Sequence, residues 1–148
     1  MSALAVDEPA LRALNERYFN ALDRRDFAAL GDCFTLDATS VYLGGEWRMQ
    51  GREEIVSRLD RILDFDSTIH APTTMSFHAD GDAVYGEVFA IATIAYQGEG
   101  GTHIMVRGLR YRDRYGEKPD GWRIAHREQD PLWQYEVQGV TPAIPASR

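Results

Sequence analysis

The chain has 148 residues, of which 44% are hydrophobic and 11% aromatic, and its formal net charge is −7. This composition predicts one globular domain with a true core and excludes a disordered chain. The acidic balance argues against a nucleic-acid partner, and no apolar run is long enough to span a membrane. Because there is one cysteine and no basic, apolar leader at the N-terminus, we expect a cytoplasmic protein without disulfides.

The first third of the chain has the apolar spacing of helices. Asp7 and Asp26 can each cap a helix N-terminus, and apolar residues recur at helical spacing after both of them. Gly51 precedes a third segment of this kind. The patterns predict, in chain order, a helix from 8 to about 23, a short helix from 27 to about 34, a strand at 36–43, its hairpin partner at 47–49 and a helix at 52–63.

Every segment after Ser67 has the pattern of β-structure, with turn signals rich in glycine and aspartate between long apolar runs. We expect strands at 68–78, 83–96, 102–115 and 122–135, followed by an irregular tail at 139–148. Helices followed by an antiparallel meander predict an α+β fold. Strands of this length must curl, so helices on the concave face would enclose a cavity.

The sequence gives little support for a metal or cofactor site. The four histidines lack the short spacings of metal-binding motifs, and the glycines at 98–101 lie between two strands instead of opening a helix. Cys33 lies on an apolar helix face, which favours packing over nucleophilic chemistry. We therefore expect an activity that needs neither a metal nor a cofactor.

Arginines alternate along the strand expected at 102–115. A solvated or subunit-contact face explains three of them: Arg110, Arg112 and Arg114. Arg107 has the opposite parity and shares the apolar, inward face with Tyr111. A buried arginine needs a partner or a ligand. An ion pair with an acid such as Glu87 and an anchor for a substrate carbonyl or carboxylate are both open.

One acid and one histidine occupy unusual positions. Asp23 lies near the C-terminal end of the first helix, where negative charge is disfavoured. His70 lies in an otherwise uncharged strand segment. If helix and strand pack together, Asp23 can hold one imidazole nitrogen and leave the other free as a base. The alternative is that Asp23 is simply solvated beside Arg24 and Arg25.

Several stretches of the chain are similar to one known family. They are LNERYFNALD at 14–23, GREEI at 51–55, TIH at 68–70, YRDRY at 111–115 and DGWRI at 120–124. Together they resemble the SnoaL-like domains of the nuclear transport factor 2-like superfamily, from about residue 11 to residue 135. The resemblance implies a single domain at 1–138, built as a cone-shaped α+β barrel in which three N-terminal helices close a curved antiparallel sheet around a central cavity. It also implies a homo-oligomer, either a dimer or a trimer.

Within that superfamily, the chain is most similar in pattern to scytalone dehydratase, hexachlorocyclohexane dehydrochlorinase and bile acid 7α-dehydratase. These enzymes have an acid late in the first helix and a histidine early in the first long strand, the positions of Asp23 and His70. Tyr18 matches a hydrogen-bonding tyrosine. Arg127 matches an active-site arginine of some members, although Trp122 and Ile124 have the opposite parity and their face is an equal candidate for the inner one.

The resemblance implies a lyase, most specifically a dehydratase, acting on a small or medium apolar ring compound. His70 would take a proton from carbon, Asp23 would orient the imidazole, and Tyr18 would bind the developing oxyanion. The candidate substrate-binding residues are Arg107, Arg127, Tyr42 and Tyr111. The counterparts of the second histidine and second acid of these enzymes are not evident at 84–96.

Two alternatives to the lyase remain. An isomerase or polyketide-cyclase-like enzyme would use the same base without losing a leaving group. A non-catalytic small-molecule-binding domain would use the Asp23–His70 contact as a structural hydrogen bond. A cavity filled by Phe89, Trp133 and Tyr135 would favour this last alternative.

Overall fold

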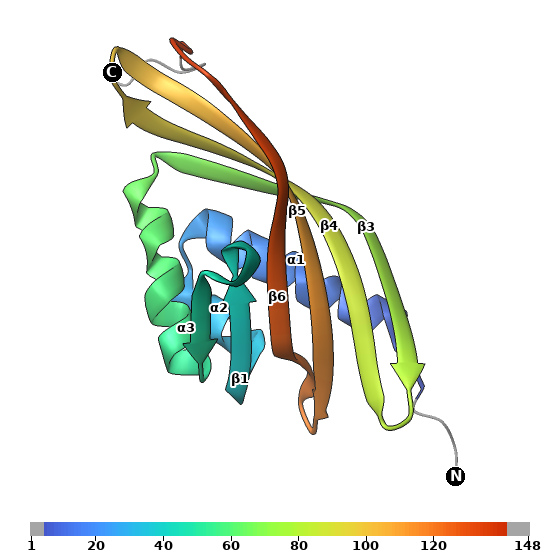
Figure 1. Cartoon of the computed structure of the whole chain (residues 1–148). Coiled ribbons are helices and arrows are strands. Elements are labelled where there is room, and N and C mark those ends of the chain that lie inside the picture. The colour runs from blue at the N-terminus through green and yellow to red at the C-terminus, as the bar shows by residue number, and fades with distance from the viewer. Residues whose placement is uncertain (1–4, 142–148) are drawn as a thin grey trace.

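The structure is a computed structural model that describes residues 5–141, and one curved sheet carries helices on its concave side (Figure 1). The helices are α1 Glu8–Arg24, α2 Phe27–Asp32 and α3 Arg52–Leu59, with 3-10 turns η1 Leu43–Gly45 and η2 Asp60–Asp64. The strands are β1 Phe34–Tyr42, β2 Trp47–Gln50, β3 Ser67–Asp80, β4 Ala83–Gly98, β5 Gly101–Lys118 and β6 Gly121–Val137. The α+β class expected from the sequence is confirmed.

Local sequence signals set the ends of the first two helices. The Asp7 carboxylate accepts a hydrogen bond from the backbone N–H of Ala10 at 3.1 Å, and Asp26 accepts one from Ala29 at 3.0 Å. The third helix is shorter than expected, because its last turn tightens into η2 after Leu59. No helix between residues 5 and 141 is both long and apolar enough to cross a membrane.

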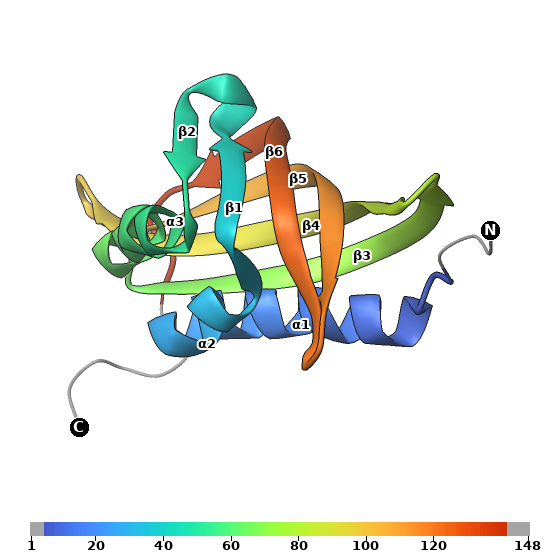
Figure 2. The ribbon, with the colours of Figure 1, turned by 90° about the horizontal axis from the view of Figure 1, so that it is seen from below.

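The strands follow the order β2-β1-β6-β5-β4-β3. β3 to β6 form the expected antiparallel meander, and β1 pairs with β2 in a hairpin. The pairing of β1 with β6 is parallel, so the sheet is not antiparallel throughout. No tight turn joins these two strands, and a hairpin therefore does not set their direction. Because β2 and β3 are free edges, the sheet stays open and the helices complete the cone (Figure 2).

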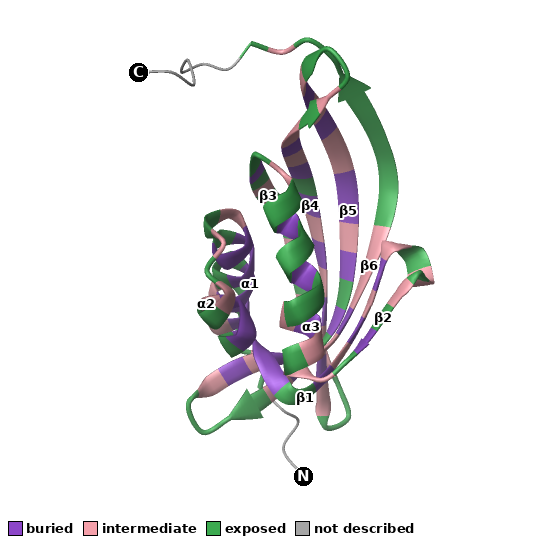
Figure 3. Ribbon diagram, turned by 90° about the vertical axis from the view of Figure 1, so that its left-hand side faces the viewer, coloured by how far each residue is buried: buried purple, intermediate pink, exposed green. Residues whose placement is uncertain are grey.

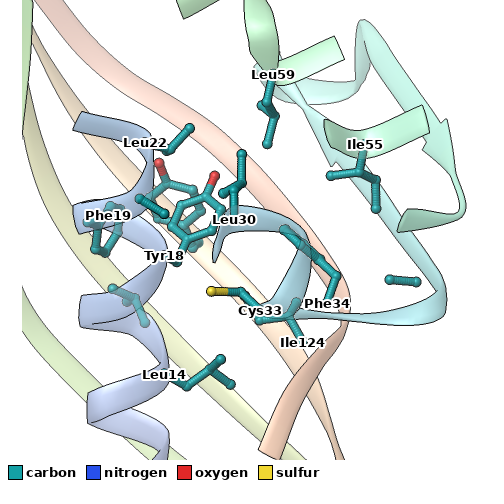
Figure 4. Close-up of a cluster of buried hydrophobic side chains, with 14 of the residues drawn as sticks. Leu14, Tyr18, Phe19, Leu22, Leu30, Cys33, Phe34, Ile55, Leu59 and Ile124 are labelled. Carbon is teal, nitrogen blue, oxygen red and sulfur yellow. The ribbon is translucent and has the colours of Figure 1, made fainter. Parts of the chain in front are cut away.

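The core lies between α1, α2 and the concave face of the sheet (Figure 4). Leu14, Tyr18 and Leu22 lie on one face of α1 and are at most 4% exposed. Cys33 is packed among these residues, and burial raises the pKa of its thiol. Its Sγ lies 3.4 Å from the carbonyl oxygen of Ala29. The sulfur therefore packs as a small apolar group, as the sequence predicts.

A β-bulge in β6 decides which side chains of that strand face inward. Ile124 pairs with Tyr115 of β5, but His126 pairs with Arg114, so Ala125 has no partner on β5. The extra residue reverses the alternation that follows it. As a result, the inward positions of β6 include Trp122, Ile124 and Arg127, which are at most 7% exposed. The sequence left open whether the inner face of this strand carries Trp122 and Ile124 or Arg127. All three point inward, the first two before the bulge and Arg127 after it.

The far ends of β5 and β6 extend past the helical layer, where β6 becomes exposed (Figure 3). Beyond β6 the chain continues alongside β5, where the backbone N–H of Val140 donates to the carbonyl of Thr102 at 3.1 Å. Residues 142–148 of the tail expected from the sequence lie outside the described part of the chain.

Candidate active site

Asp23 and His70 are brought together where the end of α1 crosses the start of β3. The Nδ1 atom of His70 lies 2.7 Å from Oδ1 of Asp23, and the backbone N–H of His70 donates to Oδ2 at 2.7 Å. The carboxylate therefore holds the ring and its backbone at once. Phe19, one turn earlier on α1, stacks on the imidazole with ring centroids 5.8 Å apart and planes 19° apart.

Two further residues explain why a carboxylate is stable at this helix end. Thr68 lies two residues before His70 on the same strand face, and its hydroxyl donates to Oδ1 of Asp23 at 2.8 Å. Arg25 has the left-handed backbone conformation that ends α1, with φ of 57°. Its guanidinium donates to the Thr68 hydroxyl at 2.8 Å and to the carbonyls of Leu22 and Ile62. Asp23 is therefore held in place by its neighbours, and 21% of its side chain is exposed.

The hydrogen bonds set the charge of the carboxylate. Burial alone would raise the pKa of Asp23, but the hydrogen bonds from His70 and Thr68 outweigh burial and lower the pKa below its ordinary value. Asp23 is therefore ionised at neutral pH and accepts a hydrogen bond from the protonated Nδ1 of His70. In the neutral ring, the lone pair then lies on Nε2. Nε2 makes no hydrogen bond to any residue between 5 and 141.

His70 borders a cavity of about 340 Å³, which lies between the sheet, α1 and the α3–η2 segment. Its apolar lining is Leu22, Leu43, Leu59, Ile62, Phe65 and Ile94. Tyr18, Tyr42 and Tyr111 also line it, and the hydroxyls of Tyr18 and Tyr42 lie 2.5 Å apart. Burial raises the pKa of all three phenols above the ordinary value, so they stay neutral hydrogen-bond donors.

Arg127 lies behind this wall of tyrosines and does not border the cavity. Its guanidinium donates to both oxygens of Asp113 at 2.7 Å, and both side chains are 0% exposed. It also donates to the Asn15 amide oxygen. The guanidinium carbon lies 4.4 Å from the ring centroid of Tyr18 and 4.6 Å from that of Tyr111. Arg127 therefore supports two rings of the cavity instead of contacting a ligand, contrary to the substrate-binding place expected for it.

Comparison with known proteins agrees with this architecture. The family described as SnoaL-like domain matches residues 4–128. An uncharacterised protein of Mycobacterium tuberculosis is 31% identical over 132 residues, which cover 86% of this chain and 87% of that protein. The chain is a member of the SnoaL-like family. As the resemblance in sequence implies, it has the nuclear transport factor 2-like fold.

Solved structures that resemble this SnoaL-like chain show the same fold. A hexachlorocyclohexane dehydrochlorinase of type 2 superposes with a TM-score of 0.81 at 18% identity, and each chain is covered to 94%. A candidate scytalone dehydratase from Novosphingobium aromaticivorans superposes with a TM-score of 0.77 at 19% identity, covering 96% of this chain and 94% of that one. At these identities the likeness concerns the fold alone.

Of the two arginines expected to bind substrate in this SnoaL-like domain, Arg107 borders the cavity. Its Nε donates to the amide oxygen of Gln134 at 3.2 Å, and Nη2 contacts the sulfur of Met105 at 3.5 Å. The ion pair with Glu87 considered from the sequence is not formed, because Glu87 lies on the opposite face of the sheet. The role of Arg107 as a substrate anchor stays a prediction.

The aromatic residues that were expected to fill the cavity in a pure binding domain lie elsewhere. Trp133 and Tyr135 are 49% and 55% exposed. Phe89 pairs with Arg110 in the sheet register, and neither borders the cavity. A larger depression of about 660 Å³ lies on the outer face, around His78 and Tyr85. It is separated by the sheet from the Asp23–His70 pair, so size alone does not identify the active site.

Four residues of the site and its support were not predicted from the sequence: Phe19, Arg25, Thr68 and Asp113. Two of them had a usable signal. Thr68 shares a strand face with His70 because the two are separated by one residue, and the alternation through Arg107 and Tyr111 continues inward to Asp113. Phe19 and Arg25 gave no such signal, since their contacts depend on how α1 lies against β3. Between residues 5 and 141, no group of three or more His, Cys, Asp or Glu side chains is arranged to hold a metal ion.

Proposed function

We propose that this protein is a cofactor-independent lyase, of the dehydratase class, whose base is His70 and whose positioning residue is Asp23. The observation that supports this most directly is the state of the imidazole. Nδ1 is fixed by an ionised carboxylate at 2.7 Å, while the ring borders an apolar cavity with Nε2 as its basic atom. This is the arrangement that general-base catalysis requires.

The reaction follows from that geometry. Nε2 takes a proton from a carbon next to a carbonyl, and the electron pair of the broken C–H bond moves into an enolate. The imidazolium formed is stabilised by Asp23. As the enolate collapses to a carbon–carbon double bond, the C–O bond of a β-hydroxyl breaks, and the imidazolium returns its proton to the leaving oxygen. Water leaves, and His70 is neutral again.

The buried tyrosines suit the enolate stage. The hydroxyls of Tyr18 and Tyr42 form one hydrogen bond with each other. The hydroxyl that accepts this bond keeps its own proton free to donate into the cavity. Their raised pKa values keep them protonated while negative charge develops on the substrate oxygen. Preorganised donors in a water-poor cavity stabilise such charge strongly. We assign the oxyanion contact to this pair and place Tyr111 beside it as part of the cavity wall.

An isomerase or cyclase is the second candidate, because proton abstraction and enolate binding serve those reactions equally well. The two differ at the last step, since an isomerase returns the proton to another carbon and loses nothing. The product mass separates them: dehydration removes one water, and isomerisation leaves the mass unchanged. A binding domain would show neither change.

The test is hydrogen–deuterium exchange at carbon in D₂O, followed by NMR and mass spectrometry on a panel of cyclic β-hydroxy carbonyl compounds. We expect exchange and loss of water with the native protein. His70→Ala should lower the rate about a hundredfold to ten-thousandfold. The matched control is His78→Ala, because His78 lies on the same strand but faces the outer depression. Equal loss in both variants, or full activity in His70→Ala, would contradict the proposal.

We also propose that the protein forms a homo-oligomer whose subunits contact each other through the outer face of the sheet. In the sheet register, Ile91, Gly108 and Trp133 form one row, and the neighbouring row contains Ile69 and Tyr135. These four apolar side chains are 37% to 66% exposed. Gly108 leaves room for the flat indole, since a Cβ there would lie 2.3 Å from Trp133. Monomers rarely expose contiguous apolar patches of this kind.

The charged side chains next to this apolar patch are compatible with a second copy of the same chain. Arg110 and Arg112 pair with Asp130 on this face. The face therefore carries both positive and negative charge, and two copies of it do not repel each other. Light scattering should give a multiple of the 16.7 kDa chain mass. Trp133→Glu should lower the mass toward one chain, whereas Leu36→Glu, which alters a residue 77% exposed on β1, should not. A monomeric native protein would contradict self-association.

A further inference from the structure

The cavity lining contains more basic than acidic side chains, although the chain as a whole is acidic. Arg58, Arg61 and Arg107 border the cavity, and Asp64 is the acid that borders it with them. The whole chain has 23 acidic and 16 basic side chains. A gathering of guanidinium groups against this excess of acids favours an anionic ligand, because a cleft of one sign concentrates ions of the other sign.

Arg107 stands opposite His70 across the floor of the cavity. In the sheet register, His70 pairs with Ala92 of β4, and Ala92 pairs with Arg107 of β5. The two residues are therefore two strands apart, about 10 Å between backbones, on the same face of the sheet. Both side chains border the same cavity, and the residue between them is the small Ala92. A ligand lying in that gap would contact the base at one end and the guanidinium at the other.

The charge of Arg107 is not neutralised by the protein. Its contacts are an amide oxygen of Gln134 and the sulfur of Met105, and neither carries charge. Among residues 5–141, no carboxylate lies within 4.0 Å of the guanidinium of Arg107 or of Arg61. An arginine stays protonated at every working pH, and a half-buried one gains by binding an anion bidentately. Arg107 differs in this from Arg127, which Asp113 neutralises.

We propose that the substrate of this protein is a cyclic carboxylate, held through its carboxylate group by Arg107 with its reacting carbon beneath Nε2 of His70. The position of the reacting carbon rests on the function proposed above, whereas the carboxylate contact does not. A cavity of about 340 Å³ accommodates one or two rings. Arg61 is exposed, lies over the Trp47 ring at 5.5 Å and attracts the anion as it enters, whereas Arg58 is paired with Glu54 at 3.7 Å.

Equilibrium binding tests the carboxylate contact without turnover. The ligands are cyclohexanecarboxylate, cyclohex-1-enecarboxylate, benzoate and 1-naphthoate, each paired with its primary carboxamide of nearly equal shape. Isothermal titration calorimetry would be run on the native protein, Arg107→Met, Arg107→Lys and His70→Ala. The matched control is Arg114→Met, which removes the same charge from the exposed, outer face of the same strand.

We expect at least one carboxylate to bind about ten to a hundred times more tightly than its amide, with an affinity that falls as salt rises. Arg107→Met should abolish that preference, Arg107→Lys should keep part of it, and Arg114→Met should keep it in full. If no carboxylate in the panel bound better than its amide, or if Arg107→Met kept the preference, the inference would be wrong.

The two proposals fail in different ways. If carboxylates bind through Arg107 and His70→Ala binds them as well as the native protein, yet no member of a wider carboxylate panel exchanges a proton, the lyase proposal fails and the binding site stands. If neutral ring compounds exchange protons at His70 and carboxylates do not bind, the base stands and the substrate class is wrong.

Discussion

Asp113 and Asp23 are each paired with a nitrogen-bearing side chain, and the two pairs differ in what surrounds them. The side chains of Asp113 and Arg127 are both 0% exposed and are joined by two hydrogen bonds of 2.7 Å, with Asn15 as a further partner of the guanidinium. Asp23 and His70 are joined by one side-chain hydrogen bond of 2.7 Å, with 21% and 9% of their side chains exposed. One pair is sealed by protein, while the other borders a cavity.

The difference separates a structural pair from the pair that we propose to be catalytic. Burial alone would lower the pKa of Arg127, but Asp113 raises it well above its ordinary value, so this group cannot exchange a proton with a substrate. An imidazole held at Nδ1 can do so through Nε2. A carboxylate and a nitrogen–oxygen distance of 2.7 Å are common to both pairs. What distinguishes the Asp23–His70 pair is a base that a substrate can reach.

The largest effect is expected from breaking the sealed pair. Arg127→Met should lower the free energy of unfolding by about 3–5 kcal/mol, because it leaves the carboxylate of Asp113 buried without its partner. The double variant Arg127→Met with Asp113→Leu should recover part of that loss, since no uncompensated charge remains. Urea denaturation measures both. A single variant as stable as the native protein would show that water reaches Asp113 and that the pair is not sealed.

The next effect is expected on activity instead of stability. Asp23→Asn keeps the shape of the side chain but removes the charge that fixes Nδ1 as the protonated atom. Turnover should fall about a hundredfold or more, as expected for loss of an oriented general base. The free energy of unfolding should change by no more than about 2 kcal/mol, because the site is partly solvated. A variant that unfolds but keeps its turnover per folded molecule would reverse the comparison between the two pairs.

The pH dependence of stability gives a smaller effect with a definite sign. The pKa of Asp23 is lower in the folded protein than its ordinary value. Its contribution to stability is therefore complete above the unfolded pKa of about 3.9 and is lost as the pH falls through the folded pKa. Urea midpoints between neutral pH and acid should fall more steeply for the native protein than for Asp23→Asn. Parallel curves would mean that the carboxylate is not stabilised by folding.

The sequence predicted what depends on local pattern. The caps at Asp7 and Asp26, the meander and the inward parity of Arg107 each follow from residues close together in the chain. The parallel pairing of β1 with β6 does not, because no short connection fixes it. Arg127 was ambiguous for a similar reason: the bulge at Ala125 reverses the alternation, and a bulge of one residue has no signature in the pattern.

The site itself was predicted in outline only. Asp23 and His70 were singled out as residues out of place, and the resemblance to a family connected them. The support from Arg25 depends on a left-handed backbone residue whose guanidinium spans α1, η2 and β3, and such a contact exists only once the three elements have packed. Sequence reasoning therefore finds the proposed reacting groups more readily than the groups that hold them.

The smallest effect should come from Thr68 and Arg25, the residues that hold Asp23 in place. Thr68→Val removes the hydroxyl that links Arg25 to Asp23 and keeps the branched shape. Losing one hydrogen bond to the carboxylate should raise the pKa of Asp23 and lower turnover by about tenfold, roughly the worth of one such bond. The pH profile of turnover should shift with it, a change that simple loosening of the fold would not cause. Thr73→Val, on the exposed part of β3, is the control and should leave rate and profile unchanged. If Thr68→Val also left the profile unchanged, Asp23 would be held by His70 alone. The contrast between the two pairs would then rest on burial, without any contribution from Thr68 and Arg25.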